Sequence, residues 1–524
     1  MPKFKPYNYN QTSMVVINYE EQLQAGTFEH AVHHLIDHKL DLSIFYPHYN
    51  NDSASGGRPA YDPAILLKII LFAYSKGITS SREIEWCCST NIIFKALSCD
   101  SVPHFTTIAH FVSSYQAEMA ELFSQIILIC HEEGLIGNEL FAIDGCKMSS
   151  NAAKEHSGTF KELEAKRDKI KQQIRYHIKE QKKLDKYDTL DDDRKKRTAK
   201  TIDTLNKAFD KYDQFVKTHS PRIGQGKRPK EVKSNTTDNE SAKMTTSKGT
   251  IQGYNGVAAV DKKHQIIIEA QAFGEGQEHH TLKPITKTIK DRYQRLGISQ
   301  NIYQDDVIVT ADTGFANEAN MQYLHENTIN AYIPDNQFRS RDPKFAHQKE
   351  KYGKRHQKPK KDQTTKVIPA SEFQFDPVKL TCVCPAEKSL SLIGVKDDIN
   401  GNPKAFFNGR LLQCRHCDLK QQCMQNPSSA DHRKGSGRQV SFMLDAKRKP
   451  TYTDWMKHRV DSKEGKYIYS HRMSVVEPVF ANIGTQKRLN RFSLRGKTKV
   501  DTQWKLYCMV HNIEKLTNYG HIAA

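Results

Sequence analysis

Short apolar segments that alternate with helical ones in the middle of this chain limit its fold more than any other feature. Residues 140–143 and 307–311 are apolar or β-branched runs with the length of buried strands. Residues 253–273 read as two further strands around a polar hairpin tip. Residues 282–296 have helical spacing and separate the later strands. Strands interleaved with helices predict a mixed α/β sheet.

The first 135 residues have a helical pattern instead. Apolar residues recur at three- and four-residue spacing in the segments 28–38, 63–74, 81–88 and 106–129. Asp62 followed by Pro63 marks a helix start, because Asp caps a first turn and Pro fits the first helical position. Residues 103–111 place a Thr-rich turn before a helix, which is compatible with helix-turn-helix DNA binding but carries no diagnostic base-reading residue. A DNA-binding domain and a plain helical domain both remain open.

Polar stretches divide the rest of the chain. Residues 155–218 are rich in Lys, Glu, Asp and Gln, and their sparse apolar residues fit two amphipathic helices joined across residues 188–193. This hairpin is either a solvated antiparallel coiled coil or an arm that contacts DNA. We therefore predict a multidomain α/β protein with these parts: a helical domain 1–135, a sheet domain 136–154 and 232–345, the hairpin with a basic linker 155–231, a basic linker 346–372, a cysteine-rich insertion 373–430 and a basic carboxy-terminal segment 431–524.

The charge balance favours a polyanionic partner. Lys and Arg number 79 and Asp and Glu 60, which leaves a formal charge of +19, and clustered cations gain affinity by releasing phosphate counterions. The longest apolar run, residues 64–74, is interrupted by Lys68 and is shorter than the ~18–20 residues of a membrane span. The first residues are basic but no apolar segment follows them, so we expect a cytoplasmic protein with reduced cysteines and no membrane partner.

Three carboxylates are candidates for chemistry. Asp144 and Asp312 each follow an apolar run, and each is followed within two residues by Gly. A carboxylate beside a small residue can share a divalent cation with carboxylates from other elements. Glu477 is the one acid in the basic and otherwise apolar segment 469–480. Taken alone, three scattered acids are equally compatible with solvated surface groups.

Five cysteines form a second candidate site. They are spaced as Cys-x-Cys, a gap and then Cys-x₂-Cys-x₅-Cys, at Cys382, Cys384, Cys414, Cys417 and Cys423. In a reducing compartment this clustering favours tetrahedral Zn²⁺, although unliganded thiols remain the alternative. His416 is a weaker candidate ligand. Cys87, Cys88, Cys130 and Cys508 lie among apolar residues and are predicted to be core residues.

Segments along nearly the whole chain resemble the DDE transposases of bacterial insertion sequences. The resemblance is carried by residues 57–61 (GRPAY), 77–85 (GITSSREIE), Asp144-Gly145 with 151–156 (NAAKEH), 237–241 (TDNES), 252–255 (QGYN), 310–315 (TADTGF), Tyr469, Arg472 and Glu477, and 490–496 (NRFSLRG). Each piece is short, and their order and spacing make the resemblance specific. Two departures are Cys146, where a small hydroxyl residue is usual, and Gly484, where a basic residue is usual.

The resemblance implies a ribonuclease-H-like catalytic domain and a metal-dependent reaction. Asp144, Asp312 and Glu477 would be the catalytic residues and would hold two Mg²⁺ ions, for which Mn²⁺ substitutes. The residues implied to contact DNA or the scissile phosphate are Tyr469, Arg472, Lys487, Arg488, Arg491 and Arg495, with Lys487 and Arg488 as stand-ins for the missing basic residue. For zinc, the resemblance selects one structural ion at Cys384, Cys414, Cys417 and Cys423 and leaves Cys382 spare.

The implied function is DNA transposition. The protein would bind transposon ends, cleave them by phosphodiester hydrolysis and join the 3′-hydroxyl ends to target DNA, as a homo-oligomer on double-stranded DNA in the nucleoid of a bacterial cell. One alternative is a metal-dependent nuclease of the same fold that does not join strands. The other is a non-catalytic zinc-containing DNA-binding regulator.

Overall fold

The computed structural model describes residues 16–49, 59–186, 192–225, 229–247, 249–345, 367–397, 402–444 and 450–521. The chain forms two compact units, Met1–Ile333 with Lys463–Ala524 and Pro334–Ser462. Most of the predicted linker 346–372 lies outside the described residues, as do Gly57 and Arg58 of the first motif. The predicted helical region and the predicted sheet belong to the same unit.

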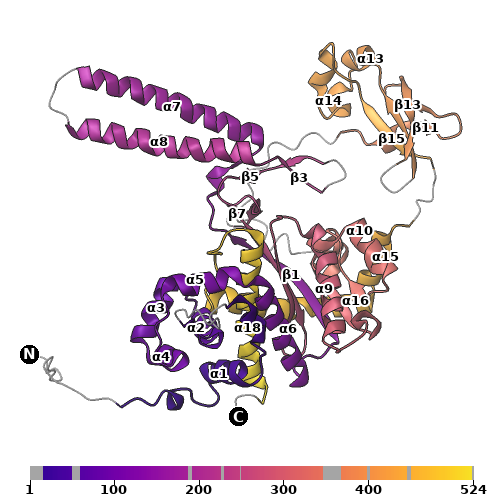
Figure 1. Ribbon diagram of the computed structural model, residues 1–524. Coiled ribbons are helices and arrows are strands. Elements are labelled where there is room, and N and C mark those ends of the chain that lie inside the picture. The colour runs from indigo at the N-terminus through magenta and orange to yellow at the C-terminus, as the bar shows by residue number, and fades with distance from the viewer. Residues whose placement is uncertain are drawn as a thin grey trace, which may run out of the picture. The chain divides into compact units, whose positions relative to one another are not determined.

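The sheet of the first unit is formed by β1 (Leu140–Ser149), β6 (Ala242–Thr246), β7 (Gly249–Asp261), β8 (Ile267–Phe273), β9 (Ile308–Ala311) and β10 (Ala331–Tyr332) (Figure 1). β1 pairs antiparallel with β7, which pairs antiparallel with β6 and β8. On its other side β1 pairs in parallel with β9, and β9 pairs in parallel with β10. The predicted mixed α/β architecture is confirmed.

The helices before the sheet are α1 (Phe28–His38), α2 (Pro63–Ser75), α3 (Ser81–Thr90), α4 (Ile92–Ser98), α5 (Phe105–Ser114) and α6 (Gln116–Glu132). α2 begins where the local signals predict, because Asp62 accepts a hydrogen bond from the Ala64 N–H at 2.7 Å and Pro63 is the first helical residue. Nearly all of α2 is buried, including Lys68, whose ammonium pairs with Asp37 at 2.7 Å. A helix that is apolar all round belongs in the interior of a bundle.

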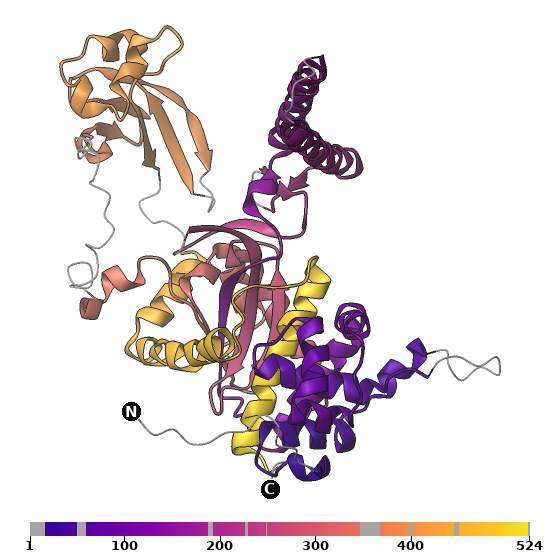
Figure 2. The same ribbon diagram turned by 90° about the vertical axis from the view of Figure 1, so that its left-hand side faces the viewer.

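The last helix, α18 (Lys497–Tyr519), packs against both the sheet and the amino-terminal helices (Figures 1 and 2). On the sheet side, the Trp504 indole N–H donates to the Val257 carbonyl at 3.1 Å, and a Cβ on Gly256 would lie 3.2 Å from the indole ring. On the helical side, the ring of Tyr507 lies 4.9 Å from that of Tyr74 in α2. Both ends of the chain therefore contribute to one core.

The remaining helices beside the sheet are α9 (Leu282–Arg295), α10 (Glu318–Glu326), α16 (Lys463–Ser470) and α17 (Arg472–Ala481). α9 packs on β8, where Arg292 forms an ion pair with the buried Glu269. α17 packs on β1 and β7, and α16 on β10. The end of α17 continues into a short π-helix, Asn482–Gln486, which precedes α18.

The polar stretch after β1 forms two long helices, α7 (Phe160–Lys186) and α8 (Asp192–Thr218), that pack against each other (Figure 1). The predicted pair of helices is confirmed, and residues 188–191 of the predicted joint lie outside the described residues. Their small core contains Leu163, Tyr212 and Phe215. Two short strand pairs accompany them, β2 (Ser157–Gly158) with β5 (Ser234–Asn235) and β3 (Arg222–Ile223) with β4 (Glu231–Val232).

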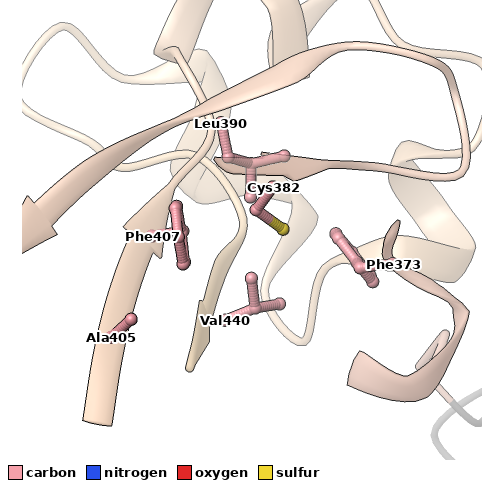
Figure 3. Packing of buried hydrophobic residues seen from close by; sticks show 6 residues of the cluster. All are labelled: Phe373, Cys382, Leu390, Ala405, Phe407 and Val440. Carbon is pink, nitrogen blue, oxygen red and sulfur yellow. The ribbon is translucent and has the colours of Figure 1, made fainter. Parts of the chain in front are cut away.

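The second unit contains an antiparallel sheet of β11 (Gln374–Asp376), β12 (Thr381–Val383), β13 (Ser389–Asp397), β14 (Pro403–Asn408) and β15 (Gln439–Met443), paired in that order. Its core is formed by Phe373, Cys382, Leu390, Ala405, Phe407 and Val440 (Figure 3). The helices of this unit are α11 (Phe338–Arg341), α13 (Leu411–Arg415), α14 (Lys420–Cys423) and α15 (Tyr452–Asp461). β15 lies beyond residue 430, where the sequence placed the end of the cysteine-rich insertion.

Candidate active site

The register of two parallel strands brings Asp144 and Asp312 together. Ile143 of β1 is paired with Ala311 of β9, and each aspartate is the next residue along its strand. Adjacent strands lie about 4.8 Å apart, so the two carboxylates leave the sheet as neighbours. β9 ends at Ala311 as predicted, whereas β1 continues past Asp144, so Asp144 lies inside its strand and not at its end.

Arg472 is the basic partner of this aspartate pair. It is the first residue of α17, and its Nη1 donates to Asp144 Oδ2 at 2.9 Å. The Arg472 side chain is 11% exposed, and its Nε has no hydrogen-bond partner within the described chain. Tyr469 lies beside it, with the ring centroid 5.9 Å from the guanidinium carbon. Of the signature residues expected from the sequence, Arg472 therefore contacts an aspartate, and Tyr469 lies beside Arg472.

A third carboxylate at this place, Glu278, was not predicted. Glu278 begins the short 3₁₀ turn Glu278–His280 between β8 and α9, and its Oε1 accepts a hydrogen bond from Asn255 Nδ2 at 3.2 Å. Gly145 and Gly314, the glycines that follow the two aspartates, leave room for this carboxylate. A Cβ on Gly145 would lie 2.9 Å from Glu278 Oε1, and one on Gly314 would overlap Glu278 Oε2. The small residues noted in the sequence were the available signal, but the group that approaches them could not be read from it.

Burial and neighbouring negative charge raise the pKa values of Asp312 and Glu278. Burial raises the pKa of Asp312, and the negative charge of Asp144 raises it further, while Arg472 and Lys147 act in the opposite direction. Burial also raises the pKa of Glu278, followed by the charge of Asp312, and the Asn255 hydrogen bond and Lys147 oppose this. Desolvation and like charge both disfavour ionised carboxylates, and a bound cation relieves both effects.

The donor set at this place suits a hard divalent cation. Carboxylate oxygens with a few substrate phosphate oxygens are the ligands Mg²⁺ prefers. Asn255 is fully buried, and its Oδ1 has no hydrogen-bond partner in the part of the chain that the structure describes. Across the same residues, no three or more His, Cys, Asp or Glu side chains converge closely enough to hold a metal by themselves. The residues therefore fit a cation that substrate oxygens would help to bind.

Glu477 lies on the same helix as Arg472. It follows Arg472 by five residues on α17, which is about 140° around the helix, and its side chain is exposed. Its place in the site stays a prediction.

The basic residues expected to contact DNA have different environments. Lys487 is buried, with its side chain 3% exposed and its ammonium 2.7 Å from Glu514 of α18. Arg488, Arg491 and Arg495 are exposed. Arg491 Nε donates to the Ser150 carbonyl at 3.1 Å and Arg495 Nε to the Asn151 carbonyl at 2.8 Å, just beyond β1. The three exposed arginines are therefore accessible to a phosphate, whereas the buried Lys487 side chain is not.

In the second unit, the four cysteines selected as zinc ligands line one cavity of about 30 Å³. Burial raises the pKa of the Cys423 thiol, Arg438 opposes this, and Cys384, Cys414 and Cys417 contribute in the same direction as burial. In the described chain the four thiols do not converge closely enough to form a ready-made metal group. A Cβ on Gly437 would lie 2.9 Å from Cys414 Sγ. Cys382 instead packs in the core of its sheet (Figure 3), where burial raises its pKa to about 11.

Two family models match the chain. The model described as Transposase DDE domain matches residues 383–517, and that described as Transposase domain (DUF772) matches residues 17–114. None of the curated proteins compared with the chain matches it. No helix within the described ranges has the length and apolar character needed to cross a membrane. The first match contains Tyr469, Arg472 and Glu477, and the second contains α1 to α5.

Proposed function

We propose that this chain, an insertion-sequence transposase of the DDE type, binds the ends of its element, cuts them and joins them to target DNA. Cutting breaks a phosphodiester bond with water as the nucleophile and leaves a 3′-hydroxyl. Joining uses that hydroxyl to attack a target phosphodiester at the same site. One observation carries this proposal: the register of β1 and β9 sets Asp144 beside Asp312, and Arg472 donates a hydrogen bond to Asp144.

We further propose that the first-unit sheet is a ribonuclease-H-like catalytic domain. What supports this is the sequence of its strands: β1, β7 and β8 form an antiparallel succession, and β9 and β10 then continue in parallel from β1. The hairpin α7–α8 is inserted after the first of these strands. Asp144 lies on β1 and Asp312 directly follows the adjacent strand β9, as a shared catalytic centre requires.

Asp144 and Asp312 would hold Mg²⁺, with Glu477 as the proposed third ligand. When bound, two such ions activate the attacking hydroxyl and stabilise the leaving oxygen. Arg472 fixes the direction of the Asp144 carboxylate, and its unpartnered Nε is available to a phosphate oxygen. Arg491 and Arg495, exposed beside Asn151, would contact the DNA backbone.

The test is cleavage and joining of a duplex that carries the element's ends. Asp144→Asn, Asp312→Asn and Glu477→Gln are each expected to abolish cleavage with Mg²⁺ or Mn²⁺ while end binding remains. Asp306→Asn is the matched control, because Asp306 is exposed before the opposite end of β9 and its positive φ of 60° suits Asn as well as Asp. Full cleavage by Asp144→Asn, Asp312→Asn or Glu477→Gln would contradict the proposed ligand set.

The same assay separates the alternatives. A nuclease of this fold would cut the duplex but form no joined product. A non-catalytic regulator would bind the ends and do neither. End cleavage followed by joined product, with both steps lost in Asp144→Asn, is the result expected for a transposase. We also propose that it acts as a homo-oligomer on DNA in the bacterial nucleoid, which sedimentation of the end complex would test.

We propose that Cys384, Cys414, Cys417 and Cys423 bind one structural Zn²⁺. Their common cavity and their mutual effect on the Cys423 thiol support this set. Structural zinc contributes folding free energy directly, so chelation should remove the metal and partly unfold the second unit. Metal analysis should find about one Zn²⁺ per chain, lost in Cys414→Ser and retained in Cys382→Ser. A folded, metal-free protein after mild purification would contradict it.

A further inference from the structure

We infer that Glu278 and Asn255 bind the divalent cation together with Asp144 and Asp312, which adds a carboxylate and an amide oxygen to the expected acids. The inference rests on the proposed function, since it concerns the same metal. It differs in the residues it assigns, because Glu278 comes from the turn after β8 and Asn255 from β7.

The first observation is the position of the Glu278 carboxylate. Its two oxygens lie against the two glycines that follow the catalytic aspartates: a Cβ on Gly145 would be 2.9 Å from Oε1, and a Cβ on Gly314 would collide with Oε2 and lie 2.9 Å from Asp312 Oδ1. The carboxylates of Glu278 and Asp312 thus face the same small space around Gly314. No basic side chain forms an ion pair with Glu278 within the described residues.

The second observation is independent of the acids. Asn255 is 0% exposed, its Nδ2 donates to Glu278, and its Oδ1 has no partner among the described residues. A Cβ on Gly145 would lie 2.7 Å from this Oδ1, so the oxygen faces the same space as Glu278 Oε1. An unpaired buried amide oxygen costs about 1–3 kcal/mol, and a cation or its water would satisfy it.

The third observation is the crowding of negative charge. The Glu278 carboxylate lies beside Asp312, and Asp312 beside Asp144, which accepts the hydrogen bond of Arg472. Arg472 and Lys147 offset part of this like charge, and a divalent cation between Asp312 and Glu278 would offset more of it. The acids do not converge into a three-ligand group by themselves in the described chain, so water and phosphate oxygens would complete the coordination.

The test measures Mn²⁺ binding to the full-length protein without DNA, with electron paramagnetic resonance as the readout. Mutating a residue that only supports metal ligands typically weakens metal binding about 10–100-fold, so Glu278→Gln should weaken Mn²⁺ binding by at least that factor. Glu278→Asp, which keeps the charge, should recover part of it. Glu275→Gln, three residues earlier in the same loop, removes the same charge and is the control; it should bind Mn²⁺ like the native protein.

Asn255→Asp provides a second variant in case Glu278→Gln does not fold. If Asn255 Oδ1 faces the cation, a carboxylate there should hold Mn²⁺ at least as tightly as the amide. If Asn255 only donates to Glu278, the new negative charge should repel Glu278 and weaken binding. Melting temperatures of all variants, measured alongside, identify any that are unfolded.

Two results would separate this inference from the proposed function. Mn²⁺ binding that is lost in Asp144→Asn and Asp312→Asn but unchanged in Glu278→Gln would overturn the role of Glu278 and leave the proposed function in place. Mn²⁺ binding and DNA cleavage that survive in all three variants would overturn both.

Discussion

Acidification should destabilise the first unit through one buried histidine, His511 of α18. Its side chain is buried, its Nε2–H donates to the Gln265 carbonyl at 3.0 Å, and its Nδ1 has no partner within the described residues. Burial lowers the pKa of His511 to about 4, and the nearby positive charges of Lys487 and Lys515 contribute, against the Gln265 carbonyl and Glu514. A proton added at Nδ1 would therefore have no acceptor.

The sign and size follow from linkage. The folded-state pKa lies below the ordinary value of 6.5, so the neutral form stabilises the fold fully above pH 6.5, and that stability is lost as the pH falls toward 4. Between pH 7.5 and pH 5 the imidazole becomes protonated in the unfolded state but stays neutral in the folded state. This lowers the free energy of unfolding by about 2 kcal/mol.

Urea unfolding at the two pH values measures this loss. The chain has three tryptophans, and replacing Trp86 and Trp455 by Phe leaves Trp504, which lies in α18 and reports on the same core. His511→Gln keeps a donor for the Gln265 carbonyl without a titrating ring, so its stability should fall by about 2 kcal/mol less than that of the native protein. His110→Gln on the exposed face of α5 is the control and should behave like the native protein. An equal fall in His511→Gln would refute the reasoning.

Further predictions concern packing, domain structure and DNA binding. Gly256→Val should destabilise the first unit by about 1–3 kcal/mol in urea, because its side chain would enter the space of Trp504 and Met148, whereas Gly484→Ala meets nothing within 4 Å and should not destabilise it. A fragment of residues 1–135 should be less stable than the same helices in the whole chain, since α2 and α6 lose their contacts with α18; circular dichroism melting compares them. End binding, measured by fluorescence anisotropy, should weaken by about 0.9 log unit per log unit of salt for each phosphate neutralised, and Arg491→Ala should reduce that slope more than Lys487→Met, whose ammonium is buried against Glu514.

Local signals in the sequence were sufficient to predict where α2 starts and that short strands precede Asp144 and Asp312. α2 starts at Pro63 because its cap and first residue are adjacent in the sequence, and the apolar runs before Asp144 and Asp312 are the strands β1 and β9. The four cysteines expected in the core, Cys87, Cys88, Cys130 and Cys508, are buried. Such features depend on residues a few positions apart, which a sequence displays directly.

Features that depend on distant pairing were missed. Lys487 was chosen as a DNA contact because it follows the signature, but it is buried against Glu514, and only the packing of α18 brings these two together. Glu278 was not predicted, since nothing in its own loop indicates that Gly145 and Gly314 will face it. β1 extends past Asp144 because β7 continues to pair with it through Ser149, which the polar residues there do not predict.

The candidate active site depends on α17, and α17 is held from its far end. Lys487 binds both Asn482, at the end of α17, and Glu514 of α18. α18 is fixed to the sheet through Trp504 and Val257 of β7, the strand that pairs with β1. The contact of Arg472 with Asp144 therefore closes a loop of interactions that passes through α17, α18, β7 and β1. Because the amino-terminal helices also pack on α18, a change there can reach the aspartates through elements that are already in contact.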